Sequence, residues 1–236
     1  RNFVESICEV LAVSGVAPDQ IGALATSGMV PAVVAVDQTG TQLRRAILQN
    51  DARAHREVAG LAAKLATVDL VTLTGSALTQ QSVAPTTVWL RDHEPENYAK
   101  IRWFLPCKDW IKFKLTGEIA TDPTEGSLSF TDVRTQTYSS AAFALYGLEE
   151  MELKAPPIIE SSQIAGRITP EAAEATGLAA GTPVVASLHD VDACAIGIGC
   201  TRPGQLSMMA GTFSINQVIS DRPMIDPRWA CRNFVR

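Results

Sequence analysis

The spacing of apolar residues predicts that the chain opens on a helix and then enters a sheet. In "FVESICEVLAVSGV" apolar side chains recur three and four positions apart, which is the spacing of one face of an α-helix. "IGALATSG" is a short apolar run that is predicted to be a buried strand leading into Gly28. "PAVVAVDQTG" is predicted to be a second strand, which closes in the turn from Asp37 to Gly40.

The middle of the chain is predicted to be helical, and the last part to alternate strands with a helix. "RAHREVAGLAAKLA" and "APTTVWLRDHEPENYAKI" are amphipathic, the second with Trp89 and Leu90 on its inner face. "WFLPCKDWIKFKLTGE" continues as a helix that ends near Gly117. From Gly181 onward we expect a strand "PVVASL", a helix of small residues, and two strands, "QLSMMAG" and "FSINQVISD". This order indicates an α/β fold.

The domain organisation follows from a change of composition before Gly181. The polar, proline-marked stretch "ESSQIAGRITPEAAEATGLAAG" is typical of a join between domains. The sequence therefore predicts two domains, residues 1–180 and residues 181–236. Neither the opening helix nor the terminal "WACRNFVR" is typical of a natural domain boundary, so we expect the chain to be a piece of a longer protein.

Composition excludes several classes of function. The net charge of −5 and the lack of a dense Lys/Arg run argue against a nucleic-acid partner. No stretch resembles a secretory signal, and no apolar run approaches the length of a membrane span. The five cysteines are scattered among apolar neighbours, which favours reduced core thiols of a cytoplasmic protein. The three histidines have no ligand spacing with a Cys pair, which argues against zinc.

Two aspartates stand where an apolar run gives way to a helix, in the stretch "SLHDVDACAIGIG". In open α/β sheets, ligands bind at the carboxyl ends of the strands. A helix N-terminus favours the ionised form of a nearby carboxylate, so Asp190 or Asp192 is a candidate general base. The alternative is that one of these aspartates only caps the helix.

A second candidate element follows the strand "QLSMMAG". In "MMAGTFSIN", the turn at Gly211 and Thr212, followed by Ser214, can aim backbone N–H groups and a hydroxyl at a phosphate. An ordinary hairpin turn explains the same residues. An acid at one strand end and a phosphate-suited turn at the next are together the parts of a phosphoryl-transfer site.

In that order, these two elements resemble the FGGY carbohydrate kinases, and the resemblance runs along nearly the whole chain. "LQNDARA" is similar to the family's "WNDxR" segment, and "APTTVWL" to its helix "APKLLWL". "LPCKDWIKFKLTGEIATDPTEGS" resembles "PKDYLxxxLTGxxxTDxxxAS", and "SLHDVDACAIGIG" resembles "GxxDxxxxxxGxG". "AGTFSIN" stands where the family has "GTS". Within the family the chain is xylulokinase-like, and "HDVDACAIG" and "MMAGTFSIN" resemble most the L-xylulose and polyol kinases. The histidine of the segment "SGQMHG" has no counterpart here, which argues against D-xylulose.

The resemblance implies an ATP-dependent transferase that uses Mg²⁺ and phosphorylates a hydroxyl of a ketopentose, a pentitol or a similar compound. The implied fold is α/β, of the actin-like ATPase and ribonuclease H-like type, in two domains with a cleft between them. It implies that Asp190 is the general base and that Gly211 and Thr212 contact phosphate. Four residues match the family's sugar-contacting positions: Met29, Asn50, Asp51 and Arg53. No metal ligand is assigned.

Two parts of the family pattern have no counterpart in this chain: the first strands with the phosphate loop "DxGTxxxR", and the adenosine pocket. We therefore expect most of the sugar-binding domain and the start of the nucleotide-binding domain, inactive when alone. A non-catalytic sugar-binding or regulatory relative is one alternative; an actin-like ATPase is another, against which "NDAR" argues. Partners are a sugar or polyol and ATP, with a homodimer left open. Asp122 and Glu125 are typical of a turn, with a ligand role left open.

Overall fold

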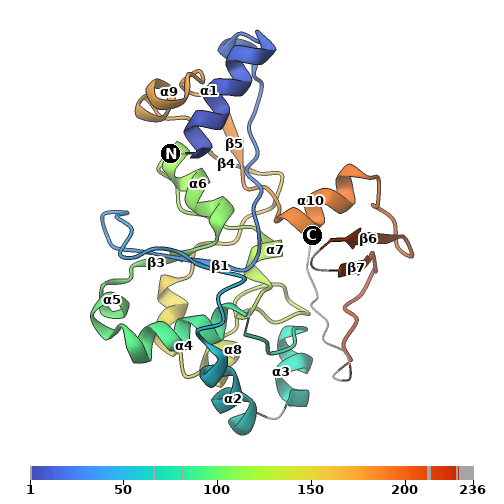
Figure 1. Cartoon of the computed structure of the whole chain (residues 1–236). Coiled ribbons are helices and arrows are strands. Elements are labelled where there is room, and N and C mark those ends of the chain that lie inside the picture. Colours follow the sequence, from blue (N-terminus) through green and yellow to red (C-terminus); the bar gives the residue numbers. More distant parts are fainter. Residues whose placement is uncertain (1, 66, 81, 212–213, 227, 229–236) are drawn as a thin grey trace.

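The computed structural model describes residues 2–65, 67–80, 82–211, 214–226 and 228, and these form a mixed α/β fold. A small sheet crosses the middle of the molecule (Figure 1). Helix α6 (Cys107–Thr116) lies on one side of this sheet and helix α4 (Val83–His93) on the other. In the part of the chain that the structure describes, no helix has both the length and the apolar character that a membrane span needs.

The central sheet has the strand order β2-β1-β3, with both pairs antiparallel. Strand β1 (Ala32–Val36) is buried along its whole length, between β2 (Ile47–Leu48) and β3 (Trp103–Leu105). The strand predicted in "PAVVAVDQTG" is confirmed, and its turn closes with the Gly40 N–H donating to the Asp37 carbonyl at 3.0 Å.

Two sequence predictions about this region are wrong. "WFL" was predicted to be helical, but it forms β3, because Pro106 disfavours a helical Leu105 and α6 begins only after the proline. "IGALATSG" was predicted to be a strand. It makes only a single parallel bridge, in which Leu24 lies opposite Val184.

The helix predicted over "APTTVWLRDHEPENYAKI" is split in two. Helix α4 ends at His93, and α5 (Pro95–Lys100) begins one residue later. The break lies at Glu94 because Pro95 has no N–H and restricts the residue before it. The remaining short helices in this half are α2 (His55–Lys64), α3 (Thr67–Thr74), α7 (Pro123–Gly126), α8 (Ser140–Leu145), and the 3-10 helices η1 (Pro18–Gln20) and η2 (Glu149–Lys154).

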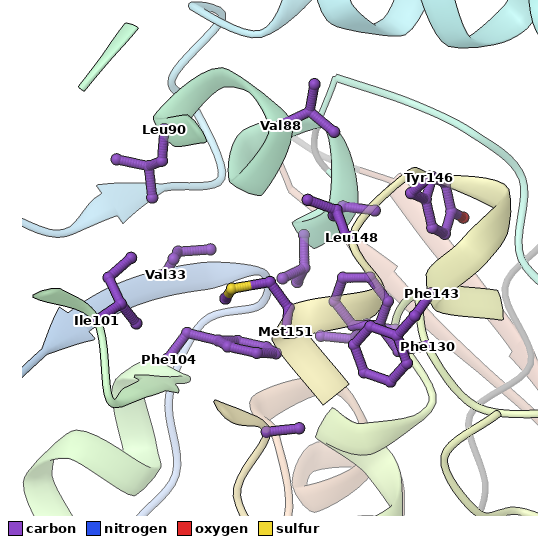
Figure 2. Packing of buried hydrophobic residues seen from close by; sticks show 14 of the residues in the cluster. Val33, Val88, Leu90, Ile101, Phe104, Phe130, Phe143, Tyr146, Leu148 and Met151 are labelled. Atoms are coloured by element: carbon purple, nitrogen blue, oxygen red, sulfur yellow. The ribbon is translucent and has the colours of Figure 1, made fainter. Parts of the chain in front are cut away.

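The main apolar core lies between the sheet and the helices α4, α8 and η2. Figure 2 shows its aromatic part, where Phe130 and Phe143 stack with ring centroids 4.4 Å apart. Phe104 and Tyr146 meet Phe130 edge to face, each with centroids 5.8 Å away. Met151 of η2 is fully buried in the same cluster.

A second apolar cluster joins distant parts of the chain. It contains residues of α1 (Asn2–Ser14), α9 (Pro170–Thr176), α6 and β5 (Pro183–Val185), together with Ile168, which directly follows β4 (Ile164–Arg167). β4 and β5 pair antiparallel. The segment expected to join two domains therefore contains β4 and α9, and it packs against α1 and α6.

The strand–helix–strand–strand order predicted after Gly181 is confirmed. β5 leads into α10 (Asp190–Gly197), and β6 (Leu206–Ala210) pairs antiparallel with β7 (Ser214–Val218). The cysteines in the described residues are free thiols. Cys8 and Cys194 are exposed, so the expectation of core thiols is wrong for these two.

Candidate functional site

The first feature of the candidate site is the junction between β5 and α10. Ser187 has a left-handed backbone, with φ at 71°, and this turns the chain from the strand into the helix. The helix cap is His189, whose ring Nδ1 accepts the N–H of Asp192 at 3.3 Å. The sequence alternative in which an aspartate caps this helix is therefore wrong. Asp190 is the first residue of the helix, so its carboxylate is not needed as the cap.

Asp190 is half-buried, and its backbone N–H donates to the Gly28 carbonyl at 3.2 Å. Burial raises the pKa of its carboxyl above the ordinary value, while N–H donors, that of Val191 among them, partly oppose the shift. A carboxylate whose pKa is raised toward neutral is a better proton acceptor than an ordinary one and still ionises. This environment suits a general base.

The hydrogen bond between Gly28 and Asp190 brings the predicted sugar-contacting residue Met29 next to the candidate base. Gly28 also lies against the start of α6: a Cβ placed there would be 3.5 Å from the Cys107 Cβ and 3.4 Å from the Lys108 backbone nitrogen. Met29 is 38% exposed, which is high for a methionine. The structure therefore unites the segment of Met29, the start of α6 and Asp190.

Asp51 and Arg53 form a local pair. The Arg53 guanidinium donates to both carboxylate oxygens, with Nη2 2.7 Å from Oδ2 and Nε 2.9 Å from Oδ1. This hydrogen bonding holds the pKa of Asp51 below its usual range. The guanidinium also lies over the Trp89 ring, 4.6 Å from its centroid, and Asn50 is exposed. In the described residues, no hydrogen bond or ion pair connects the Asp51–Arg53 pair to Asp190.

The predicted phosphate-binding turn lies between β6 and β7. The strands pair in register up to Ala210 opposite Ser214, and Gly211 comes directly after β6. The hairpin predicted as the alternative is therefore present, and the phosphate role remains a prediction. Thr212 lies outside the described residues.

Sequence reasoning missed a buried ionic cluster beneath this site. The side chains of Lys108, Asp109, Lys112 and Asp122 are fully buried. Lys108 Nζ lies 2.8 Å from Asp109 and 2.9 Å from Asp122, and Lys112 Nζ lies 2.6 Å from Asp109. Burial lowers the pKa of Lys108, but Asp109 and Asp122 outweigh it and hold that pKa above the ordinary value. Lys112 has one close carboxylate, and burial leaves its pKa lowered.

Hydrogen bonds connect the buried ionic cluster to the start of α10. Both lysine ammonium groups donate to the Ala186 carbonyl at the end of β5. Asp122 caps α7 and accepts the Thr124 hydroxyl at 2.7 Å, and the same hydroxyl accepts the His189 N–H at 3.2 Å. The cluster therefore fixes both the strand end before Asp190 and the residue that caps its helix.

The chain was compared with known proteins and solved structures. Residues 1–197 match the FGGY family of carbohydrate kinases, N-terminal domain. A protein named "Probable L-xylulose kinase" from Pasteurella multocida (strain Pm70) is 34% identical over 214 residues, covering 90% of this chain and 44% of that protein. An autoinducer-2 kinase of Escherichia coli (strain ATCC 8739) is 31% identical over 232 residues, covering 97% and 43%.

A solved structure agrees with these sequence matches. The xylulose kinase of Rhodospirillum rubrum superposes with a TM-score of 0.85 at 33% identity, and the match covers 94% of this chain and 45% of that one. The chain thus spans less than half the length of each of these relatives.

Proposed function

Because the chain belongs to the FGGY family of carbohydrate kinases, we propose that it supplies the sugar-binding part of an enzyme that phosphorylates a hydroxyl of a sugar or polyol with ATP. The observation that carries this proposal is Asp190, the first residue of α10, which has a half-buried carboxylate and whose backbone N–H donates to the carbonyl of Gly28, the residue before Met29. Phosphoryl transfer needs such a group to accept the proton of the attacking hydroxyl.

In the proposed reaction, Asp190 takes the proton from one hydroxyl of the acceptor, while the oxygen of that hydroxyl attacks the γ-phosphorus of ATP. The bond from that phosphorus to the bridging oxygen breaks, and ADP leaves. The ionic cluster beneath α10 keeps Asp190 in place without touching the substrate. Its task is positioning, which matters because small displacements of a reacting group slow a reaction strongly.

The acceptor is proposed to be a ketopentose, a pentitol or a similar compound, since the relatives named above are kinases of L-xylulose, xylulose and autoinducer-2. Met29, beside the base, is proposed to contact it directly. Asn50 is exposed, and the Asp51–Arg53 pair is only part-buried. These groups are proposed to bind the hydroxyls farther from the reacting end.

For the whole protein we propose two domains of the actin-like, ribonuclease H-like fold, with the boundary near residues 180 and 181, in the cytoplasm. Gly211 and Thr212 are proposed to bind the phosphates of ATP. Mg²⁺ usually binds to one or two carboxylates plus substrate phosphates. The described residues contain no group of three or more His, Cys, Asp or Glu side chains suited to a metal, and Asp190 is proposed as the proton acceptor, so we propose that Mg²⁺ would be held by the phosphates of ATP, with no metal ligand assigned to this chain. Mg²⁺ bound there would neutralise phosphate charge.

The test is Asp190→Asn in the full-length protein that contains this chain. Because His189 caps α10, the melting temperature and the affinity for the acceptor should be retained, while kcat falls about 10²- to 10⁴-fold. Asp192→Asn is the comparison variant and should keep most of the turnover. Turnover near wild type in Asp190→Asn would refute the assignment, and no acceptor-dependent ADP release by the wild type would favour the sugar-binding alternative.

A further inference from the structure

Glu125 on α7 is a buried carboxyl that no part of the proposed mechanism uses. It is 5% exposed, and in the described residues neither carboxyl oxygen has a hydrogen-bond partner. A buried polar group without a partner costs free energy, so such a group in a folded protein calls for a water molecule or a ligand. Both of its oxygens are therefore available to a molecule that enters from outside the chain.

The charges around Glu125 bear on the protonation state of its carboxyl group. The neighbouring ionic cluster contains two lysines, Lys108 and Lys112, and two aspartates, Asp109 and Asp122, so it is balanced without a third anion. Burial raises the pKa of Glu125 well above its usual value. Lys108 opposes this shift, and the nearby aspartates add to it. This shift favours the protonated form of Glu125, which has one O–H donor as well as acceptor oxygens.

Glu125 belongs to the same junction as Asp190. The preceding residue, Thr124, accepts the backbone N–H of His189, next to the candidate base. The half-buried Cys107 thiol lies within electrostatic reach of both acids: its pKa is raised by burial and then by the charges of Glu125, Asp109 and Asp190. Gly28, whose carbonyl accepts the Asp190 N–H, packs against the same Cys107.

Glu125 also borders a cavity of about 30 Å³ whose walls include Thr121, Ser129, Tyr138 and several apolar residues. One water molecule needs roughly 10–15 Å³ of such space. The cavity therefore has room for about two water-sized groups, which is the size of a hydroxyl and the carbon that carries it.

We propose that Glu125 is a specificity-determining residue, whose carboxyl group forms a hydrogen bond with an acceptor hydroxyl other than the one that Asp190 deprotonates. The inference rests on the proposed function and deepens it: the acceptor must place a hydroxyl at the Glu125 acid and a second hydroxyl at Asp190. Compounds with only one hydroxyl, or with a methyl group at the Glu125 position, are poor acceptors.

The test uses Glu125→Leu and Glu125→Gln in the full-length protein, with the exposed Glu171→Gln on α9 as the matched control. Steady-state kinetics with a series of polyols and ketoses gives KM and kcat for the acceptor and for ATP. We expect Glu125→Leu to raise the acceptor KM about tenfold or more, with the ATP KM unchanged, because a donor is lost. Glu125→Gln keeps an N–H donor and should raise the KM less; Glu171→Gln should change nothing.

Acceptors that lack one hydroxyl (deoxy acceptors) show whether Glu125 binds the acceptor or only supports the fold. The acceptor that lacks the hydroxyl bound by Glu125 should have the same KM with wild type and with Glu125→Leu. Unchanged acceptor KM values in Glu125→Leu, with an unchanged melting temperature, would overturn the inference and leave Glu125 bonded only to trapped water. If Glu125→Leu does not fold, the same comparison of acceptor KM values is made with Glu125→Gln and the deoxy acceptors, and it is read in the same way. Failure of the proposed function is distinct, because the wild type would then phosphorylate none of the compounds.

Discussion

Replacing Asp109 by asparagine tests the buried ionic cluster most directly. Asp109 accepts three hydrogen bonds: from Lys108 Nζ at 2.8 Å, Lys112 Nζ at 2.6 Å and Thr121 Oγ1 at 2.6 Å. The variant Asp109→Asn keeps the shape of the side chain, but it leaves Lys108 paired with Asp122 alone and removes the ion pair that Lys112 makes in the described residues. Removing one partner of a buried ion pair costs about 3–5 kcal/mol. For a chain of this size, that corresponds to a melting temperature lower by roughly 6–20 °C.

The structure also predicts how this loss depends on pH. The pKa of Lys112 is lowered by burial, and the Lys108 charge lowers it further, so Lys112 is the group that can release its proton in the variant. Between that lowered pKa and the ordinary value of 10.5, the folded state binds fewer protons than the unfolded state. Stability then rises with pH. Asp109 opposes this lowering in the wild type, so Asp109→Asn lowers the pKa of Lys112 further, and the variant should gain more stability than the wild type from about pH 6 to about pH 9.

Urea unfolding followed by circular dichroism measures this loss at both pH values. The control is Asp92→Asn, which breaks an exposed pair with Arg91 and should leave the urea midpoint unchanged. A loss below about 1 kcal/mol in Asp109→Asn would refute the reasoning, because it would mean that the lysines are hydrated rather than paired in a dry interior.

Two other substitutions test the environment of Glu125 and the turn at Gly40. Above its usual pKa of 4.5, the unfolded state releases the Glu125 proton that the folded state keeps, so wild-type stability falls as pH rises. In urea titrations, the free energy of unfolding of Glu125→Gln should therefore increase relative to that of the wild type from about pH 4 to about pH 8. A difference between the two that stays constant with pH would contradict this. Gly40 and Gly117 both have positive φ, but only at Gly40 would a Cβ meet the Phe113 ring, at 2.4 Å. Gly40→Ala should thus lower the thermal midpoint more than Gly117→Ala; equal losses would show that the ring moves aside.

Much of the fold could be predicted from the pattern of apolar residues, because most helices and strands bury one continuous run or face. The predictions failed where the apolar spacing within a segment indicated one structure but pairing with a distant segment decided another. Trp103–Leu105 carries the apolar spacing of the helix after it, yet β1 needs a partner for its backbone groups on that edge. Leu24 forms a single bridge, to Val184, which is paired with β4 on its other side, and the apolar run around Leu24 gave no sign that its pairing would be so short.

The candidate site also contains residues that a local sequence signal indicates and residues that it does not. An acid after an apolar strand is a local signal, which left Asp190 and Asp192 as candidates; the family resemblance then selected Asp190, which the structure places at the helix start. The buried state of Lys108 and Lys112 could not be found, since charged residues are mostly exposed. One signal was present: the two lysines are four residues apart, which places them on one face of α6.

The contact between α1 and α9 has a consequence for synthesis on the ribosome. Leu11 of α1 packs in the cluster that includes Leu178, and the Cys8 thiol donates to the Thr176 carbonyl 168 positions later. At about 5–20 residues per second, α1 waits on the order of 10–30 s before that surface is translated. During this interval the part of its apolar face that packs on α9 has no native partner, so a chaperone that covers nascent helices should raise the yield of folded protein.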